Sequence, residues 1–339
     1  MIAMKTENVL ILLACFFGFA VFTGFGGNKS EPGATDATPN KPMINIPVFD
    51  EDSAYAFVKQ QVGFGPRVPG TPAHTRCAAY FTDTFKSYLF NVTVQETSVT
   101  AYNGKLLDCK NIIASHKPEM IDRIFLAAHW DSRPFADEDA DPKNVHQPID
   151  GANDGASGAG VLLEIARQIS LNKPEIGIDI ILFDCEDFGQ PEKNAGPRVK
   201  DSWCLGSQYW AKHPHKPDYH AKYGILLDMV GATNAVFIKE GFSQRYAPDV
   251  VRKVWNAAFS AGYSKYFIHE TQGTAIVDDH FYINRITGIP TIDIIHLNEG
   301  TGNSFFRQWH TVKDNMDVID RKTLKAVGQT LMTVIYEAP

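Results

Sequence analysis

The stretch Arg123–Ser132 (RIFLAAHWDS) indicates the fold, because it runs from a continuous apolar segment directly into polar residues. Such an apolar run is typical of a strand buried on both faces of a parallel sheet. Ile178–Asp184 has the same character, and the amphipathic segment Gly158–Leu171 between them repeats its apolar residues at the period of a helix. The alternation predicts an α/β fold, a single globular domain with a central, mostly parallel, twisted sheet and helices on both faces.

The same patterns divide the rest of the chain. Further predicted strands are Asn111–Ala114, Tyr223–Met229, Ala235–Lys239, Tyr266–His269 and Thr291–His296. Further predicted helices are Asp50–Val62, Thr71–Leu89, Leu205–His213, Ser243–Ala261 and Arg321–Tyr336. No internal repeat and no second linker interrupts residues 47–339, so we expect one domain there.

Composition excludes several classes of protein. The 339 residues carry 32 Lys and Arg against 39 Asp and Glu, a formal net charge of −7, and no basic cluster offers phosphates a surface. We therefore expect no nucleic-acid partner. The serine-hydrolase pattern GxSxG and the phosphate-binding pattern GxxxxGK[ST] are both absent from the sequence.

The N-terminus predicts export. Val9–Phe25 is an uncharged, mostly apolar run of 17 residues behind Lys5, shorter than the roughly 20 residues of a membrane span. We interpret residues 1–27 as a cleaved signal, a lipoprotein-type signal with lipidation at Cys15, or an uncleaved anchor. Residues 28–46 are then a flexible tether to a periplasmic domain that meets the membrane only through this segment.

The remaining cysteines leave two alternatives open. Cys77, Cys109, Cys185 and Cys204 fit no zinc-finger spacing. In an oxidising compartment they allow up to two disulfides in three connectivities, or they are buried free thiols.

Polar residues gather where predicted strands end, the edge at which open α/β sheets bind ligands. Four segments supply them: LAAHWDS with His129, GANDGASGAG with Asp154, LFDCEDFG with Glu186 and Asp187, and WHTVKDN with His310. Aspartate and histidine side chains form a reasonable three-ligand set for catalytic zinc. Because neighbouring side chains diverge at a strand end, one of the pair Glu186–Asp187 can bind metal while the other faces the substrate as a base.

At these residues the sequence resembles the zinc aminopeptidase superfamily and, within it, the animal-like glutaminyl cyclases that are also found in bacteria. The resemblance runs from FGPRVPGTPAH (Phe64–His74) to WHTVKDNMDVID (Trp309–Asp320). It implies one zinc ion per chain held by Asp154, Asp187 and His310, with Glu186 as general acid/base. It further implies a catalytic carboxylate at Asp278, substrate contacts from Trp309 and Asp228, and a second-shell or second-metal position at His129.

The sequence departs from the animal cyclases at three places. Asp187 stands where they have Glu, which shortens the metal-binding arm by one methylene, and Asp293 stands where they have His. The segment Gly189–Asp201 has no evident counterpart, and we expect it to reshape the rim of the pocket.

The resemblance implies an enzyme that converts N-terminal glutamine of peptides or proteins to pyroglutamate with release of ammonia, acting as a monomer. The alternative is a two-zinc aminopeptidase, whose five ligand positions His129, Asp154, Asp187, Asp228 and His310 are all present. Aminopeptidases of this superfamily usually have Ser at the position of Asp278 and rarely Trp at that of Trp309, so both residues favour cyclisation. A non-catalytic binding domain is disfavoured because no metal ligand is missing.

Overall fold

The computed structural model describes residues 45–337 except 192, 194–195, 270–273 and 298–304. The predicted signal or anchor segment 1–27, with Cys15, and nearly all of the predicted tether 28–46 lie outside the described residues. Among the helices that are described, none combines the length and the apolar character needed to cross a bilayer.

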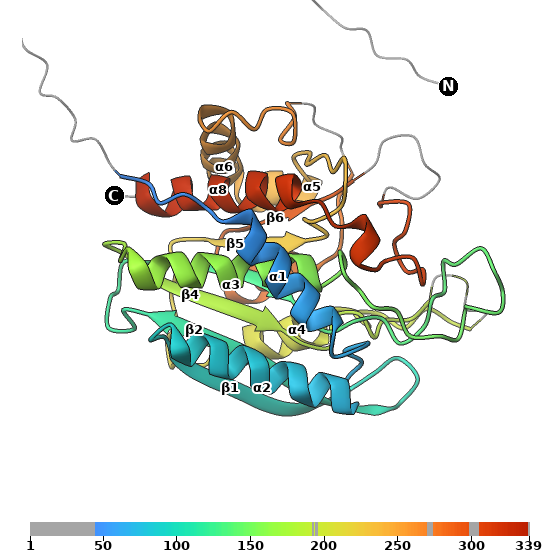
Figure 1. The fold of residues 1–339 in the computed structure, drawn as a ribbon. Helices are drawn as coiled ribbons and strands as arrows, with labels where there is room; N and C mark the ends of the chain where they lie inside the picture. The colour runs from blue at the N-terminus through green and yellow to red at the C-terminus, as the bar shows by residue number, and fades with distance from the viewer. Residues whose placement is uncertain (1–44, 192, 194–195, 270–273, 298–304, 338–339) are drawn as a thin grey trace, which may run out of the picture. The chain divides into compact units, whose positions relative to one another are not determined.

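The centre of the domain is a six-stranded mixed sheet with the order β1-β2-β4-β3-β5-β6 (Figure 1). The strands are β1 Asn91–Thr100, β2 Leu106–His116, β3 Arg123–His129, β4 Gly177–Phe183, β5 Gly224–Asp228 and β6 Thr291–Ile295. β4, β3, β5 and β6 run parallel, whereas β1 and β2 pair antiparallel at one edge. The predicted α/β class is confirmed, and its parallel part is the four strands that end in the polar segments.

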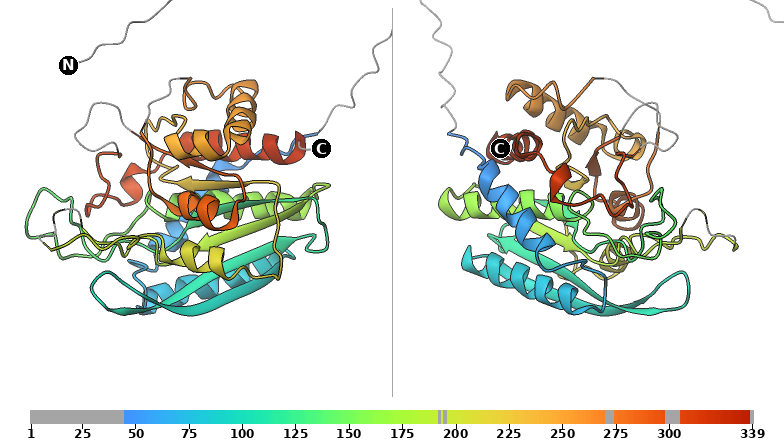
Figure 2. Two further views of the ribbon diagram at one scale, coloured as in Figure 1. Left: turned by 180° about the vertical axis from the view of Figure 1, so that it is seen from behind. Right: turned by 45° about the vertical axis from the view of Figure 1, so that its right-hand side comes forward.

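Helices cover both faces of this sheet. They are α1 Glu51–Val62, α2 Pro72–Ser87, α3 Ala156–Leu171, α4 Leu205–Lys212, α5 Gly241–Tyr246, α6 Pro248–Ser260, α7 Asp279–Thr287 and α8 Arg321–Glu337. One buried cluster joins α1, α2, α3, α6 and α8 to one face of the strands, and a second joins α4 and α7 to the other. The view from behind brings α4 and α7 to the front of the sheet (Figure 2, left).

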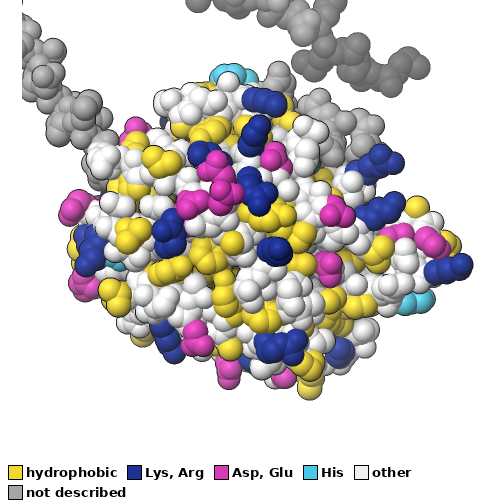
Figure 3. Space-filling model, viewed as in Figure 1, with side chains coloured by type: hydrophobic (Ala, Val, Ile, Leu, Met, Phe, Trp, Pro, Cys, Tyr) yellow, Lys and Arg dark blue, Asp and Glu magenta, His cyan; other side chains and the backbone are white. Residues whose placement is uncertain are grey.

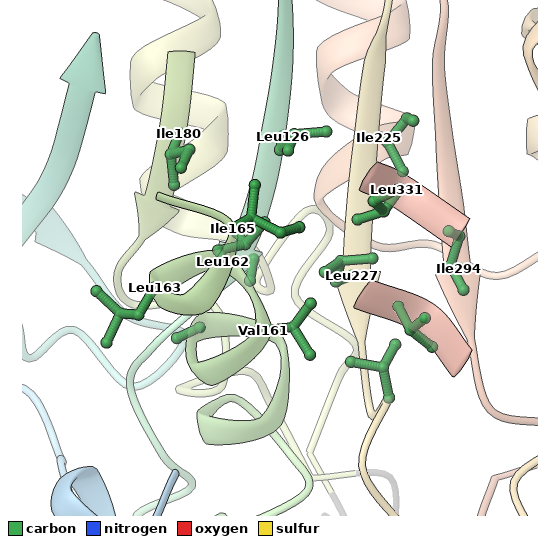
Figure 4. Packing of buried hydrophobic residues seen from close by; sticks show 14 of the residues in the cluster. Leu126, Val161, Leu162, Leu163, Ile165, Ile180, Ile225, Leu227, Ile294 and Leu331 are labelled. Atoms are coloured by element: carbon green, nitrogen blue, oxygen red, sulfur yellow. The ribbon is translucent and has the colours of Figure 1, made fainter. Parts of the chain in front are cut away.

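The core follows from alternation along the strands. Leu126 and Ile180 belong to the cluster on the α3 face, whereas their neighbours Phe125 and Ile181 belong to the α4 face. The apolar side of α3, with Val161 and Ile165, packs onto the first of these faces (Figure 4). Because both faces are covered there, the central strands β3, β4 and β5 are mainly apolar.

Three differences separate the expected elements from the observed ones. β1 and α7 were not predicted, because their residues are largely polar or half-buried. The predicted helix Ser243–Ala261 is two helices divided at Ala247, since Pro248 has no N–H to continue a helix from the preceding turn. The predicted strands Ala235–Lys239 and Tyr266–His269 meet only through a single bridge, Phe237 with Phe267.

All four described cysteines are buried free thiols. Of the two alternatives that the sequence leaves open, the structure therefore contains the free thiols.

The face seen in Figure 3 carries acidic and basic side chains interspersed. It offers no continuous basic surface to a phosphate backbone.

Candidate active site and metal centre

The polar segments meet at the carboxyl edge of the parallel strands. β3 ends at His129 and β5 at Asp228, while Glu186 follows the end of β4. Asp154 lies in the turn before α3, and His310 precedes the short 3₁₀ helix Met316–Val318. Residues up to 181 positions apart thus come together, as the strand-end argument predicts.

Asp154, Asp187 and His310 form a compact cluster of candidate metal ligands. One ligand atom from each lies within 4.8 Å of the others, with His310 Nε2 3.1 Å from Asp187 Oδ1 and 3.6 Å from Asp154 Oδ2. All three side chains are buried, yet Asp154 Oδ2 and both carboxylate oxygens of Asp187 accept no hydrogen bond from any residue that the structure describes. Buried, unpaired carboxylate oxygens are costly unless they bind a cation, so the donor set fits Zn²⁺.

Two buried carboxylates orient the loops that carry these ligands. Asp131 accepts hydrogen bonds from the backbone N–H groups of Glu186 and Asp187, both at 3.1 Å. Asp314 accepts from those of Asn153 and Asp154 at 2.8 and 3.0 Å. Sequence analysis left these roles unassigned, because nothing local distinguishes a carboxylate that binds backbone from one that binds metal.

The backbone at the site adopts conformations that few residues prefer. Gly155 has φ +93°, and a Cβ there would lie 2.6 Å from the carbonyl oxygen of Asp131. Cys185 and His310 are in the left-handed region at φ +55° and +53° although neither is glycine. Such residues cluster at functional sites, where the surrounding contacts hold them in place.

Glu186 lies in a buried acidic environment beside the candidate metal ligands. Burial is the largest cause that raises its pKa well above the ordinary value, and the charges of Asp187 and Asp278 add to it while His129 opposes it. Its Oε1 is 3.2 Å from Cys204 Sγ, which also lies 3.8 Å from Asp278 Oδ1. Burial raises the pKa of Cys204 well above its usual range, so the thiol keeps its proton and donates it toward the carboxylates.

His129 forms a second cluster with Asp154 and Asp228. Its Nε2 is 3.0 Å from Asp154 Oδ1 and 3.2 Å from Asp228 Oδ1. Burial disfavours the charged ring, but hydrogen bonds to Asp131, Asp154 and Asp228 raise the pKa of His129 well above its ordinary value. Burial raises the pKa of Asp228 to about 7. The cluster therefore suits either a protonated histidine between carboxylates or a second metal ion.

A pocket of about 330 Å³ opens onto these groups. Trp309 lines it and stacks on the His310 ring, with centroids 3.6 Å apart. Asp278 lines it as the N-cap of α7, accepting the N–H of Asp279 at 2.5 Å. Arg198, from the segment Gly189–Asp201, also reaches the lining, the rim position expected of that segment.

Trp203 is a pocket residue that sequence analysis missed. Its ring stacks on that of His310 with centroids 5.9 Å apart, and the Arg133 guanidinium lies 4.4 Å from its centroid. Arg133 also forms a two-pronged ion pair with Asp137, whose Oδ1 is 3.4 Å from His310 Nδ1. A carboxylate that contacts one ring nitrogen of a histidine determines which nitrogen faces a metal. Asp137 and the stacked Trp203 therefore orient the His310 ring.

Known proteins share much of this sequence and fold. The model of peptidase family M28 matches residues 111–335. A structure of a glutaminyl cyclase from Bacteroides thetaiotaomicron, bound to N-acetylhistamine, is 55% identical and has a TM-score of 0.85, covering 87% of this chain and 100% of that one. A structure described as a leucine aminopeptidase precursor from the same species is 54% identical, with a TM-score of 0.84 and coverage of 87% and 100%. A glutaminyl-peptide cyclotransferase from Gloydius blomhoffii is 25% identical over 80% of this chain and 77% of its own length.

The chain belongs to peptidase family M28. Within that family it is closely similar to bacterial glutaminyl cyclases, at 53–55% identity over nearly their whole length. Zinc dependence is general in this family, and the unpaired oxygens of Asp154 and Asp187 fit it.

Proposed function

We propose that the protein is a zinc-dependent glutaminyl-peptide cyclotransferase that converts N-terminal glutamine to pyroglutamate and releases ammonia. The observation that carries this proposal is the position of Glu186 and Asp278. Both line the pocket beside the cluster Asp154, Asp187 and His310, with ligand-type atoms of Glu186, Cys204 and Asp278 within 4.8 Å of one another. The raised pKa of Glu186 suits it to carry a proton from one substrate nitrogen to the other.

The residues divide the reaction as follows. The substrate α-amine attacks its own γ-amide carbon, so no water is consumed and positioning itself lowers the barrier. Glu186 takes a proton from the attacking amine and delivers it to the departing amide nitrogen, which leaves as ammonia as the carbon–nitrogen bond breaks. Asp154, Asp187 and His310 would hold a zinc ion, which would supply Lewis acidity toward the γ-amide carbonyl.

Other pocket residues hold the substrate. Asp278 and Asp228 accept hydrogen bonds from the leaving nitrogen. Trp309 donates its indole N–H to a substrate carbonyl and forms one wall of the pocket. Trp203, with Arg133 over its ring, stacks on His310 and keeps it in place.

A second candidate function is hydrolysis by a two-zinc aminopeptidase. The cluster His129, Asp154 and Asp228 favours it, because it supplies the ligands of a second ion around the shared Asp154.

Paired assays separate the two functions. Purified protein is incubated with a glutaminyl peptide and with leucyl-anilide, and its metal content is measured. Ammonia release from the peptide, no cleavage of the anilide and about one zinc per chain support the cyclase. Efficient anilide cleavage with two zincs per chain refutes it.

Glu186→Gln tests the assignment of the base. Turnover falls by about 10²- to 10⁴-fold, the usual contribution of general acid–base catalysis, while zinc occupancy stays intact. The matched control is Glu175→Gln, whose carboxylate is 97% exposed and forms only a loose ion pair with Lys117. Loss of zinc from the Glu186 variant contradicts the assignment.

We further propose that the enzyme is monomeric and exported, either as a periplasmic protein or anchored to the membrane through its N-terminal segment. Cell fractionation with and without Cys15→Ala tests lipidation. Mass determination in solution tests the monomer.

A further inference from the structure

A second hollow adjoins the catalytic pocket and has no assigned role. It encloses about 390 Å³ next to the 330 Å³ pocket. Arg198, Trp203 and Val277 line both cavities, so the second begins where the first ends. A peptide whose N-terminal residue occupies the catalytic pocket would pass these shared residues on its way out.

The outer hollow is cationic in a chain whose net charge is −7. Lys200 and Arg285 line it together with Arg198, and Asp201 is the one acidic residue among the described residues of its lining. Asp201 accepts a hydrogen bond from the Tyr282 hydroxyl at 3.2 Å and lies 3.9 Å from the Lys200 ammonium. Lys200 and Arg285 beside this carboxylate give the described part of the mouth an excess of positive charge.

The inner pocket has the opposite character. Its lining is rich in carboxyl groups, which come from Asp154, Glu186, Asp187, Asp228 and Asp278. Carboxyl groups in the inner pocket suit the amine of a peptide's first residue, and the positive charge of the outer hollow suits an acidic side chain later in the same peptide.

We propose that the hollow lined by Arg198, Lys200 and Arg285 is the subsite for the residues after the N-terminal glutamine, and that it selects substrates with Asp or Glu there. This inference rests on the proposed cyclase function. Trp203 and Val277 provide apolar surface for the peptide backbone between the two cavities. An extended chain advances about 3.3 Å per residue, so the second to fourth residues are the ones to test.

Peptide series measure this preference directly. C-terminally amidated peptides of the form Gln-Ala-Ala-Ala receive Glu, Gln or Lys at position two, three or four, and cyclisation is followed by ammonia release. At one or more positions, Glu raises kcat/KM by about two- to fivefold over Gln, and Lys lowers it, as expected of exposed charge pairs. The preference disappears at about 0.5 M NaCl, where charges are screened over a few ångströms.

Substitutions in the lining test whether the preference for Glu comes from this hollow. The readout is the ratio of kcat/KM for the Glu peptide to kcat/KM for the Lys peptide. This ratio does not depend on the fraction of active enzyme. Arg285→Gln lowers this ratio and Arg285→Glu lowers it further, toward the Lys peptide. The matched control, Arg252→Gln, removes an exposed arginine of α6 that lines neither cavity and leaves the ratio unchanged.

The outcomes separate the two proposals. Equal kcat/KM for Glu, Gln and Lys peptides at all three positions refutes the subsite while leaving cyclisation intact. A preference that Arg285→Glu does not alter also refutes it. Failure to cyclise any peptide, the neutral one included, refutes the proposed function itself.

Discussion

Glu240→Gln removes a buried charge that holds one wall of the pocket. Glu240 is fully buried at the start of α5, where its carboxylate accepts the N–H groups of Phe242 and Ser243 at 2.8 and 2.6 Å. It also accepts the N–H of Ile276 at 2.8 Å and lies 3.0 Å from His280 Nε2. The same carboxylate thus ties α5 and α7 to Ile276, which lines the pocket.

The pKa of Glu240 sets the size of the effect. Burial alone would raise this pKa, but the hydrogen bond and charge of His280, with the two capping N–H groups, lower it from 4.5 to about 2. That difference corresponds to about 3 kcal/mol of stability. Because the folded pKa is the lower one, the contribution is complete above pH 4.5 and is lost as the pH falls toward 2.

Urea unfolding at pH 7 and pH 3 measures this contribution. At pH 7 the variant is less stable than the wild type by about 3 kcal/mol, and at pH 3 the gap narrows to about half of that. The control Asp249→Asn, whose carboxylate is 84% exposed, changes stability by less than about 0.5 kcal/mol. A gap of the same size at both pH values refutes the reasoning, since it would mean that the lost interaction does not depend on the charge of Glu240.

Three further predictions concern the site and its scaffold. Cys204→Ala lowers kcat about tenfold at unchanged zinc content, because Glu186 loses a hydrogen-bond donor. Cys204→Ser keeps a donor at this position and is faster than Cys204→Ala. Equal kcat values in the two variants contradict this prediction. Chelation abolishes ammonia release and lowers Tm, because the clustered carboxylates are then buried without a cation, and added zinc reverses both effects. Asp179→Asn costs about 3–5 kcal/mol in chemical unfolding, because it leaves Arg123 buried without its two-pronged partner. Zinc content is unchanged in that variant, because Arg123 lies at the opposite end of β3 from the site.

Much of the fold was predictable because its signals are local. The apolar runs of β3 and β4 and the helical period of α3 reflect which side chains each segment must bury. β1 was missed because an edge strand is half-exposed and shows no such run. The break at Pro248 was missed because the apolar period continues across it.

The candidate site was predictable only in part. Polar residues after buried strands indicated Asp154, Glu186, Asp187 and His310, and the structure brings these together. Their catalytic and metal-binding roles stay predictions. Trp203 gave no comparable signal, because an isolated tryptophan in a loop is as easily a core residue as a pocket wall.

By itself, the sequence determined that strands alternate with helices, that carboxylates and histidines follow the strand ends, and that the cysteines match no zinc-finger spacing. Only the tertiary structure decided which of these groups meet. The order β4-β3-β5 places the ends of three strands side by side. Asp131 and Asp314 then hold the loops that carry the metal ligands by accepting hydrogen bonds from their backbone N–H groups. Hydrophobic periodicity is a property of a few consecutive residues, whereas the charge, burial and spacing of a site depend on contacts between residues far apart in the chain.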